Sequence, residues 1–190
     1  MLLNVPNVVT LSRIVLIPLL IGIYYFPEDW LSWQGKNLTS TAVFIFAGIT
    51  DWLDGFLARR LNQMSAFGAF LDPVADKLIV VAALLALLYL ARIDMIVALI
   101  IVGREIAISA LREWMAKVGQ SASVAVAYVG KLKTVAQMVA IPLLLFHDPL
   151  FGTLDSQWLG TILINVAAVL TVASMLYYLR KALPYASVRG

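Results

Sequence analysis

The chain has 190 residues, of which 62% are hydrophobic and 13% are charged, whereas a soluble globular domain carries about 45–50% apolar residues. A soluble fold of this size has too little interior to bury that much apolar surface, so the composition predicts an integral membrane protein. The net charge of +3 is too small for a nucleic-acid-binding face. Because the chain has no cysteine and only one histidine, disulfides, thiolate catalysis and Cys- or His-clustered zinc sites are excluded.

The apolar residues form six runs, each near the length of a helix that crosses a bilayer. The sequence therefore predicts an all-α integral membrane protein, a single domain over residues 1–190, with six transmembrane helices and a short interfacial segment before the first. Gly35 and Asn37 are expected in the connector after the first span, because both residue types favour turns. The predicted spans are residues 10–26, 39–58, 74–91, 95–113, 124–146 and 157–179.

The basic residues are unevenly divided between the two sides of this arrangement. With six spans both termini lie on one side, and ten basic residues share that side, against Lys36 and Arg92 on the other. Basic loops favour the cytoplasm, so the sequence predicts a multi-pass inner-membrane protein with both termini and the loop near residue 60 in the cytoplasm. The ten are Arg13, Arg59, Arg60, Arg112, Lys117, Lys131, Lys133, Arg180, Lys181 and Arg189.

Four acidic residues are concentrated where the second predicted span ends and the third begins. The spacing places Asp51 with Asp54 on one helix face, and Asp72 with Asp76 on a face of the next helix. Carboxylates at a membrane boundary repel one another unless cations neutralise them. Oxygen ligands favour Mg²⁺ or Mn²⁺, and four carboxylates suffice for two ions. The cluster therefore predicts metal-assisted phosphoryl transfer.

Small residues are interleaved with these acids. Gly55, Ala58 and Gly68 leave helix surfaces open to a flat ligand, and Arg59 is placed to pair with a phosphate. The alternative is that these small residues only allow two helices to pack closely.

Together these residues match the signature D-x2-D-G-x2-A-R-x8-G-x3-D-x3-D at all eight specified positions. The chain therefore resembles the CDP-alcohol phosphotransferase family, whose members transfer the phosphatidyl group of a CDP-linked lipid to an alcohol and release CMP. The resemblance implies the fold of that family, two bound ions, and Asp76 as the general base on the alcohol. It further implies a metal site of Asp51, Asp54, Asp72 and Asp76, and a cytidine-nucleotide pocket of Asp54, Gly55, Ala58, Arg59 and Gly68.

Four further cations indicate a second anion site. Arg104 lies deep within the fourth span, Arg112 follows eight residues later, and Lys131 and Lys133 open the fifth span; an ionisable residue inside a membrane suggests function. Alternatively, Arg104 forms a structural pair with Glu105, and the lysines reflect topology or anionic headgroups. A phosphorylated acceptor accounts for all four.

The resemblance extends through residues 4–13, 103–114 and 130–137 and favours the branch of the family whose acceptor is glycerol 3-phosphate. It implies that Arg104, Arg112, Lys131 and Lys133 bind the phosphate group of that acceptor. It also implies that Thr10 and Arg13 line the CDP-diacylglycerol site from the first helix, and that the protein is a homodimer among membrane lipids.

Other functions stay open from the sequence. Within the family, the acceptor could be inositol phosphate, serine or phosphatidylglycerol. An aspartate-rich membrane prenyltransferase also sets carboxylates and Mg²⁺ against a pyrophosphate, but with two separated motifs and more spans. A cation transporter could use the same carboxylates as an ion site, although no internal repeat is evident.

Overall fold

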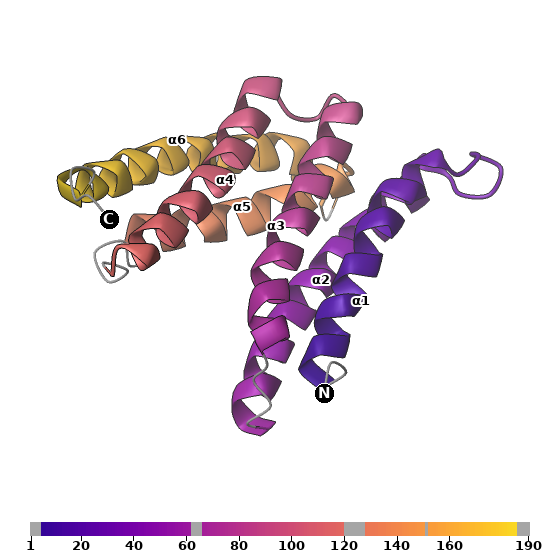
Figure 1. The fold of residues 1–190 in the computed structure, drawn as a ribbon. Helices are drawn as coiled ribbons and strands as arrows, with labels where there is room; N and C mark the ends of the chain where they lie inside the picture. The colour runs from indigo at the N-terminus through magenta and orange to yellow at the C-terminus, as the bar shows by residue number, and fades with distance from the viewer. Residues whose placement is uncertain (1–4, 62–65, 120–127, 151, 186–190) are drawn as a thin grey trace. The chain divides into compact units, whose positions relative to one another are not determined.

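A computed structural model describes residues 5–61, 66–119, 128–150 and 152–185, with side chains over 8–51, 68, 70–119, 130–150 and 152–185. In these ranges the ordered elements are helices, apart from one isolated bridge between Leu150 and Leu154. The prediction of an all-helical chain is therefore confirmed. The α-helices are α1 (Val5–Gly22), α2 (Trp33–Leu61), α3 (Ala66–Tyr89), α4 (Met95–Lys117), α5 (Tyr128–Phe146) and α6 (Ser156–Ala182), with the short 3-10 helices η1 (Ile23–Tyr25) and η3 (Leu183–Tyr185) (Figure 1).

Each predicted apolar run coincides with one of these helices, but α1, α2 and α3 begin five or more residues earlier than expected. The prediction that Gly35 and Asn37 lie in a connector is wrong, because both are inside α2. The Ser32 hydroxyl accepts a hydrogen bond from the Gly35 backbone nitrogen at 3.2 Å. A serine in this position satisfies an unpaired N–H group and allows the helix to start there.

Two helical segments in the described part are long and apolar enough to cross a membrane: Val8–Tyr25 and Ser156–Tyr185. In α3 and α4, charged side chains such as Asp76 and Arg104 interrupt the apolar stretch. The six-span count therefore stays a prediction, because a helix that carries charged site residues has no long uninterrupted apolar run.

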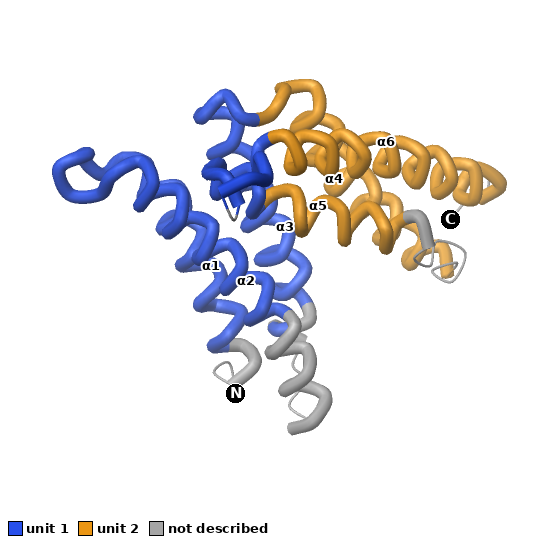
Figure 2. The backbone as a smooth tube through the Cα atoms, turned by 180° about the vertical axis from the view of Figure 1, so that it is seen from behind, with its two compact units in different colours: residues 1–92, 142–157 blue, residues 93–141, 158–190 orange. Residues whose placement is uncertain are grey.

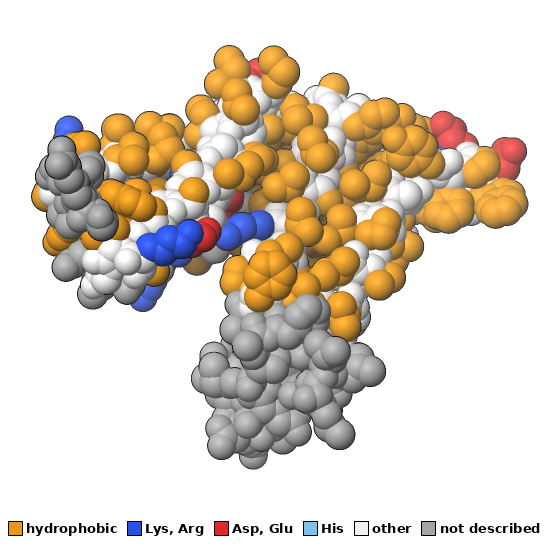
Figure 3. Space-filling view, in the orientation of Figure 1, with side chains coloured by type: hydrophobic (Ala, Val, Ile, Leu, Met, Phe, Trp, Pro, Cys, Tyr) orange, Lys and Arg blue, Asp and Glu red, His pale blue; other side chains and the backbone are white. Residues whose placement is uncertain are grey.

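The surface of the described helices is rich in exposed apolar side chains, and Figure 3 shows hydrophobic groups over much of the visible face. Exposed aromatic residues gather near the end of α1, where the Tyr25 and Tyr89 rings stack at 6.2 Å and those of Phe26 and Trp30 at 6.4 Å. Aromatic side chains are enriched where membrane meets water. This surface is typical of a membrane-associated protein. Exposed apolar residues on the six helices include Val15, Ile49, Leu85, Leu99, Val135 and Val169.

The chain forms two compact units, which Figure 2 distinguishes by colour. Unit 1 comprises Met1–Arg92 and Pro142–Gln157, and unit 2 comprises Ile93–Ile141 and Trp158–Gly190. In unit 1, α1 packs against both α2 and α3, with Leu20, Phe44 and Ala83 among the buried residues. The N-terminal helix therefore lies where it can contact residues from both neighbouring helices.

In unit 1, Arg92 joins segments that are far apart in the sequence. Its guanidinium donates to the backbone oxygens of Leu144 and Leu145 at 3.2 and 2.8 Å, and to Asn37 Oδ1 at 2.8 Å. The two carbonyls lie in the last turn of α5, where helix carbonyls lack partners within the helix. Burial lowers the pKa of Arg92, although an arginine stays charged at any physiological pH.

In unit 2, α4 and α6 pack together through a buried cluster. The cluster contains Ile108 and Met115 from α4, and Tyr178 and Ala182 from α6. Ile108 and Met115 are seven residues apart, so they lie on the same side of α4. This contact brings that face of α4 to the Tyr178 ring.

Candidate active site

Three of the four predicted metal ligands are brought together by side chains of α1. Thr10 Oγ1 donates a hydrogen bond to Asp72 Oδ1 at 2.6 Å. Arg13 Nη1 donates to Asp51 Oδ1 at 2.8 Å and also pairs with Asp76. Thr10 and Arg13 are one helical turn apart, and Asp72 and Asp76 are likewise one turn apart on α3. Because α1 packs against both α2 and α3, the face of α1 that carries Thr10 and Arg13 contacts acidic residues of both helices.

The acidic cluster consists of Asp51, Asp72 and Asp76. Its carboxylates and the arginine that pairs with two of them differ in exposure to water. The Arg13 side chain has no exposed surface, whereas the side chains of Asp51 and Asp76 are each 44% exposed. A buried guanidinium is stable only when anions compensate it, and these carboxylates do so. In the ion pairs that the described residues form here, one guanidinium faces two partly exposed carboxylates, Asp51 and Asp76. This negative balance favours a further cation.

The chemistry of the donors fits the predicted Mg²⁺ or Mn²⁺. All the acidic donors are carboxylate oxygens, which hard divalent ions prefer. Two of them, Asp51 and Asp76, already converge on a positive group, because Arg13 pairs with both. Within the described ranges, no three His, Cys, Asp or Glu side chains are close enough to share an ion. The fourth predicted ligand, Asp54, has its side chain outside the described residues.

The predicted cytidine-nucleotide pocket lies largely outside the described side chains. Asp54, Gly55, Ala58 and Arg59 belong to α2, so the expected helical spacing of this motif is confirmed, but their surroundings are outside the described residues. Gly68 is on α3 and is buried. The assignment of these residues to the nucleotide stays a prediction.

In unit 2, a second charged cluster has the opposite balance. Glu105 Oε1 accepts a hydrogen bond from Arg104 Nη1 at 3.3 Å and pairs with the Lys133 ammonium of α5. Arg104 Nη2 also donates to the Ser174 hydroxyl of α6 at 3.4 Å. Two predicted phosphate-binding cations thus share one carboxylate, which agrees with the alternative that Arg104 pairs with Glu105. One glutamate between two cations leaves excess positive charge.

The other two predicted phosphate-binding residues are more open. Arg112 is exposed, and its guanidinium carbon lies over the Tyr178 ring at 5.8 Å from the ring centre. Lys131 is exposed in the first turn of α5, two residues before the buried Lys133. The structure therefore connects Arg104 with Lys133 through Glu105, and Arg112 with α6 through Tyr178.

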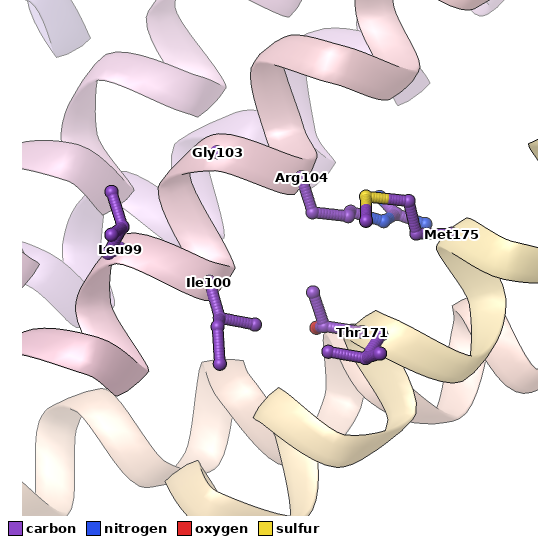
Figure 4. Close-up of a pocket in the computed structure, with 7 residues that line it drawn as sticks. Leu99, Ile100, Gly103, Arg104, Thr171 and Met175 are labelled. Atoms are coloured by element: carbon purple, nitrogen blue, oxygen red, sulfur yellow. The ribbon is translucent and has the colours of Figure 1, made fainter.

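A cavity of about 290 Å³ lies beside Arg104, between α4 and α6 (Figure 4). Arg104 Nε and Thr171 Oγ1 are buried here with no hydrogen-bond partner among the described residues. The rest of the wall is formed mainly by apolar side chains, so the cavity suits an apolar group better than a phosphate. Its lining residues are Leu99, Ile100, Gly103, Arg104, Thr171, Val172 and Met175.

Two residues of this region were not identified as site residues from the sequence. Glu105 was expected only as a structural partner of Arg104, although its position next to that arginine was a usable signal. Tyr178 was not predicted at all, because it lies far along the chain in an apolar helix that carries no motif. Only the packing of α6 on α4 reveals it.

The chain is similar to named proteins over nearly its whole length. A family model described as CDP-alcohol phosphatidyltransferase matches residues 3–173. A protein of Salmonella choleraesuis (strain SC-B67), named CDP-diacylglycerol--glycerol-3-phosphate 3-phosphatidyltransferase, is 47% identical over 181 residues, which cover 94% of each chain. Proteins of the same name from Salmonella typhi and Escherichia coli (strain K12) are 46% and 45% identical, with the same coverage.

Proposed function

Because the chain belongs to the CDP-alcohol phosphatidyltransferase family, we propose that it transfers the phosphatidyl group of CDP-diacylglycerol to the 1-hydroxyl of sn-glycerol 3-phosphate. The products are phosphatidylglycerophosphate, a precursor of phosphatidylglycerol and cardiolipin, and CMP. The observation that carries the proposal is the acidic cluster, in which α1 gathers Asp51, Asp72 and Asp76. Relatives that match 94% of the chain carry this activity in their names.

In the proposed reaction, Asp76 takes the proton of the glycerol 3-phosphate 1-hydroxyl. The alcohol oxygen then forms a bond to the phosphorus of the phosphatidyl group, and the bond from that phosphorus to the CMP oxygen breaks. The Asp76 carboxylate is partly exposed, so it can pass the proton to water after each turnover. Arg13 holds the Asp76 carboxylate in place through their ion pair.

The residues proposed to hold Mg²⁺ or Mn²⁺ are Asp51, Asp54, Asp72 and Asp76. When bound, two such ions would lower the pKa of the attacking alcohol and stabilise charge on the attacking and leaving oxygens. Arg59 is assigned to the phosphate of departing CMP, and Gly55, Ala58 and Gly68 are assigned to the cytidine. Thr10 orients the Asp72 carboxylate by its hydrogen bond.

For the acceptor, we assign the phosphate group to Arg104, Arg112, Lys131 and Lys133. An exposed arginine presents a planar fork of N–H donors that matches a phosphate, and Arg112 has that exposure. The excess positive charge around Glu105 supports the same assignment, because an anionic ligand would balance it.

We further propose a multi-pass protein of the cytoplasmic membrane with six spans, whose termini and active site face the cytoplasm. The support is the excess of basic residues on that side of the predicted topology. A homodimer is proposed as well, and the mass of the purified protein, corrected for bound detergent, tests it. Labelling of single cysteines introduced near residues 36 and 117 with an impermeant reagent tests the sidedness.

The experiment that tests the function is a CMP-release assay on the full chain in detergent, with CDP-diacylglycerol and Mg²⁺. Four acceptors are compared: glycerol 3-phosphate, inositol phosphate, serine and phosphatidylglycerol. Release only with glycerol 3-phosphate is the expected result. Release with another acceptor would overturn the assignment of the cations but keep the acidic cluster as the catalytic centre. Absence of release with every acceptor would refute the proposed reaction.

A further inference from the structure

Two arginines of α4 lie over one aromatic ring of α6. The guanidinium carbon of Arg104 is 5.9 Å from the centre of the Tyr178 ring, and that of Arg112 is 5.8 Å from the same centre. Both distances are within the range at which the negative face of a ring attracts a cation. A single side chain thus contacts two of the cations assigned to the acceptor phosphate.

The ring itself is held rigidly. Tyr178 has no exposed surface and packs with Ile108, Met115 and Ala182 in the buried cluster of unit 2. Ile108 is four residues from each arginine along α4, so it lies between them on the helix surface. Because the ring packs against Ile108 in this buried cluster, its position does not depend on the two arginine side chains.

Arg104 and Arg112 differ in what else restrains them. Arg104 has Glu105 and Ser174 as hydrogen-bond partners at 3.3 and 3.4 Å. Arg112 is exposed, and among the described residues its guanidinium is restrained by the Tyr178 ring. A free arginine side chain loses considerable rotamer entropy when it binds a ligand. A ring that restrains it beforehand reduces that loss.

We infer that Tyr178 is a positioning residue for the acceptor, which holds the guanidinium groups of Arg104 and Arg112 in place for a phosphorylated alcohol. This inference rests on the proposed function, because it takes both arginines as ligands of the acceptor phosphate. Tyr178 acts through the two arginines and does not contact the reacting atoms. Its loss therefore changes the binding of the acceptor and leaves the chemical step and the lipid substrate unaffected.

The test compares variants at position 178 in the CMP-release assay, with KM measured for each substrate separately. Tyr178→Leu removes the ring but stays apolar, and it is expected to raise the glycerol 3-phosphate KM about tenfold. Its kcat and its CDP-diacylglycerol KM are expected within about twofold of the wild-type values. Tyr178→Phe retains the ring and is expected to restore a KM near that of the wild type.

A matched control is Tyr89, whose exposed ring stacks on that of Tyr25 at 6.2 Å in unit 1. Tyr89→Leu is expected to leave both KM values unchanged. In a double-mutant cycle with Arg112→Ala, the additional effect of Tyr178→Leu should shrink, because the ring then has only Arg104 to position. Full additivity on the logarithmic scale would contradict the inference.

If Tyr178→Leu does not fold, a phenylalanine fluorinated on its ring is placed at position 178. This residue keeps the shape of the ring but weakens its negative face, and the same selective rise in the acceptor KM is expected. Equal rises in both KM values, or no rise, would overturn the inference. If the wild-type protein releases CMP only with another acceptor, the proposed function fails first, and the inference fails with it.

Discussion

The two charged clusters of this protein are built on the same plan with opposite signs. In unit 1, carboxylates of α2 and α3 surround one buried cation, Arg13. In unit 2, cations of α4 and α5 share one carboxylate, Glu105. Among the described residues, one group of the minority charge pairs with two groups of the opposite charge in each cluster. The remaining charge makes the first cluster suited to a cation and the second suited to an anion.

The largest effect is expected from Asp76→Asn, which tests whether the acidic cluster performs the chemistry. The amide cannot accept the proton of the alcohol, so kcat should fall by about 10²–10⁴-fold, while the CDP-diacylglycerol KM changes little. CMP release under saturating substrates measures this. Asp29→Asn, at an exposed loop position, is the control and should retain wild-type turnover. Near-normal turnover in Asp76→Asn would rule out the assignment of the base.

A second prediction removes the minority charge of unit 1. Arg13→Met keeps the apolar stem but leaves Asp51 and Asp76 without their buried partner, so the free energy of unfolding should fall by about 2–3 kcal/mol. Mg²⁺ should recover part of this loss and should raise the melting temperature more in the variant than in the wild type. Thermal unfolding in detergent, with Mg²⁺ or with a chelator, measures both effects. Equal shifts in the two proteins would contradict this account of the acidic cluster.

The corresponding experiment in unit 2 is Glu105→Gln, which removes the minority charge of the second cluster. It leaves the buried Lys133 without its anionic partner, and the expected loss of stability is about 1–3 kcal/mol. Here glycerol 3-phosphate or inorganic phosphate, not Mg²⁺, should give the larger rescue of the melting temperature. The control is Glu113→Gln, which breaks the exposed pair with Lys117 at 2.9 Å and should leave the melting temperature nearly unchanged. Rescue by Mg²⁺ instead of phosphate would contradict the claim that the second cluster is suited to an anion.

The smallest effect is expected from Arg112→Ala. Loss of one charged hydrogen-bonding partner of the acceptor phosphate should raise the glycerol 3-phosphate KM about tenfold, with the CDP-diacylglycerol KM unchanged. Steady-state kinetics with each substrate varied in turn provide the measurement. Lys117→Ala, an exposed change near the same end of α4, should leave both values as they were. Equal rises in both KM values would place Arg112 outside the acceptor site.

Much of the fold was predictable because helices depend on neighbours in sequence. Six apolar runs predicted six helices, and the spacing of Asp72 and Asp76 placed them on one face of α3. The start of α2 was misjudged, because the Ser32 cap outweighs the turn preference of Gly35 and Asn37. The number of spans stays open for a related reason: the charged residues that mark the candidate site also interrupt the apolar stretches.

The sequence by itself determined the helical class, the membrane character and the acidic motif, because each depends on composition or on spacings of a few residues. Only the tertiary structure decided which charges meet. Thr10 reaches Asp72 across 62 positions, Arg13 reaches Asp51 across 38, and Lys133 reaches Glu105 across 28. Such pairs depend on which helices pack together and at what rotation, and no local pattern encodes that. The place of Tyr178 beneath two arginines of another helix has the same origin.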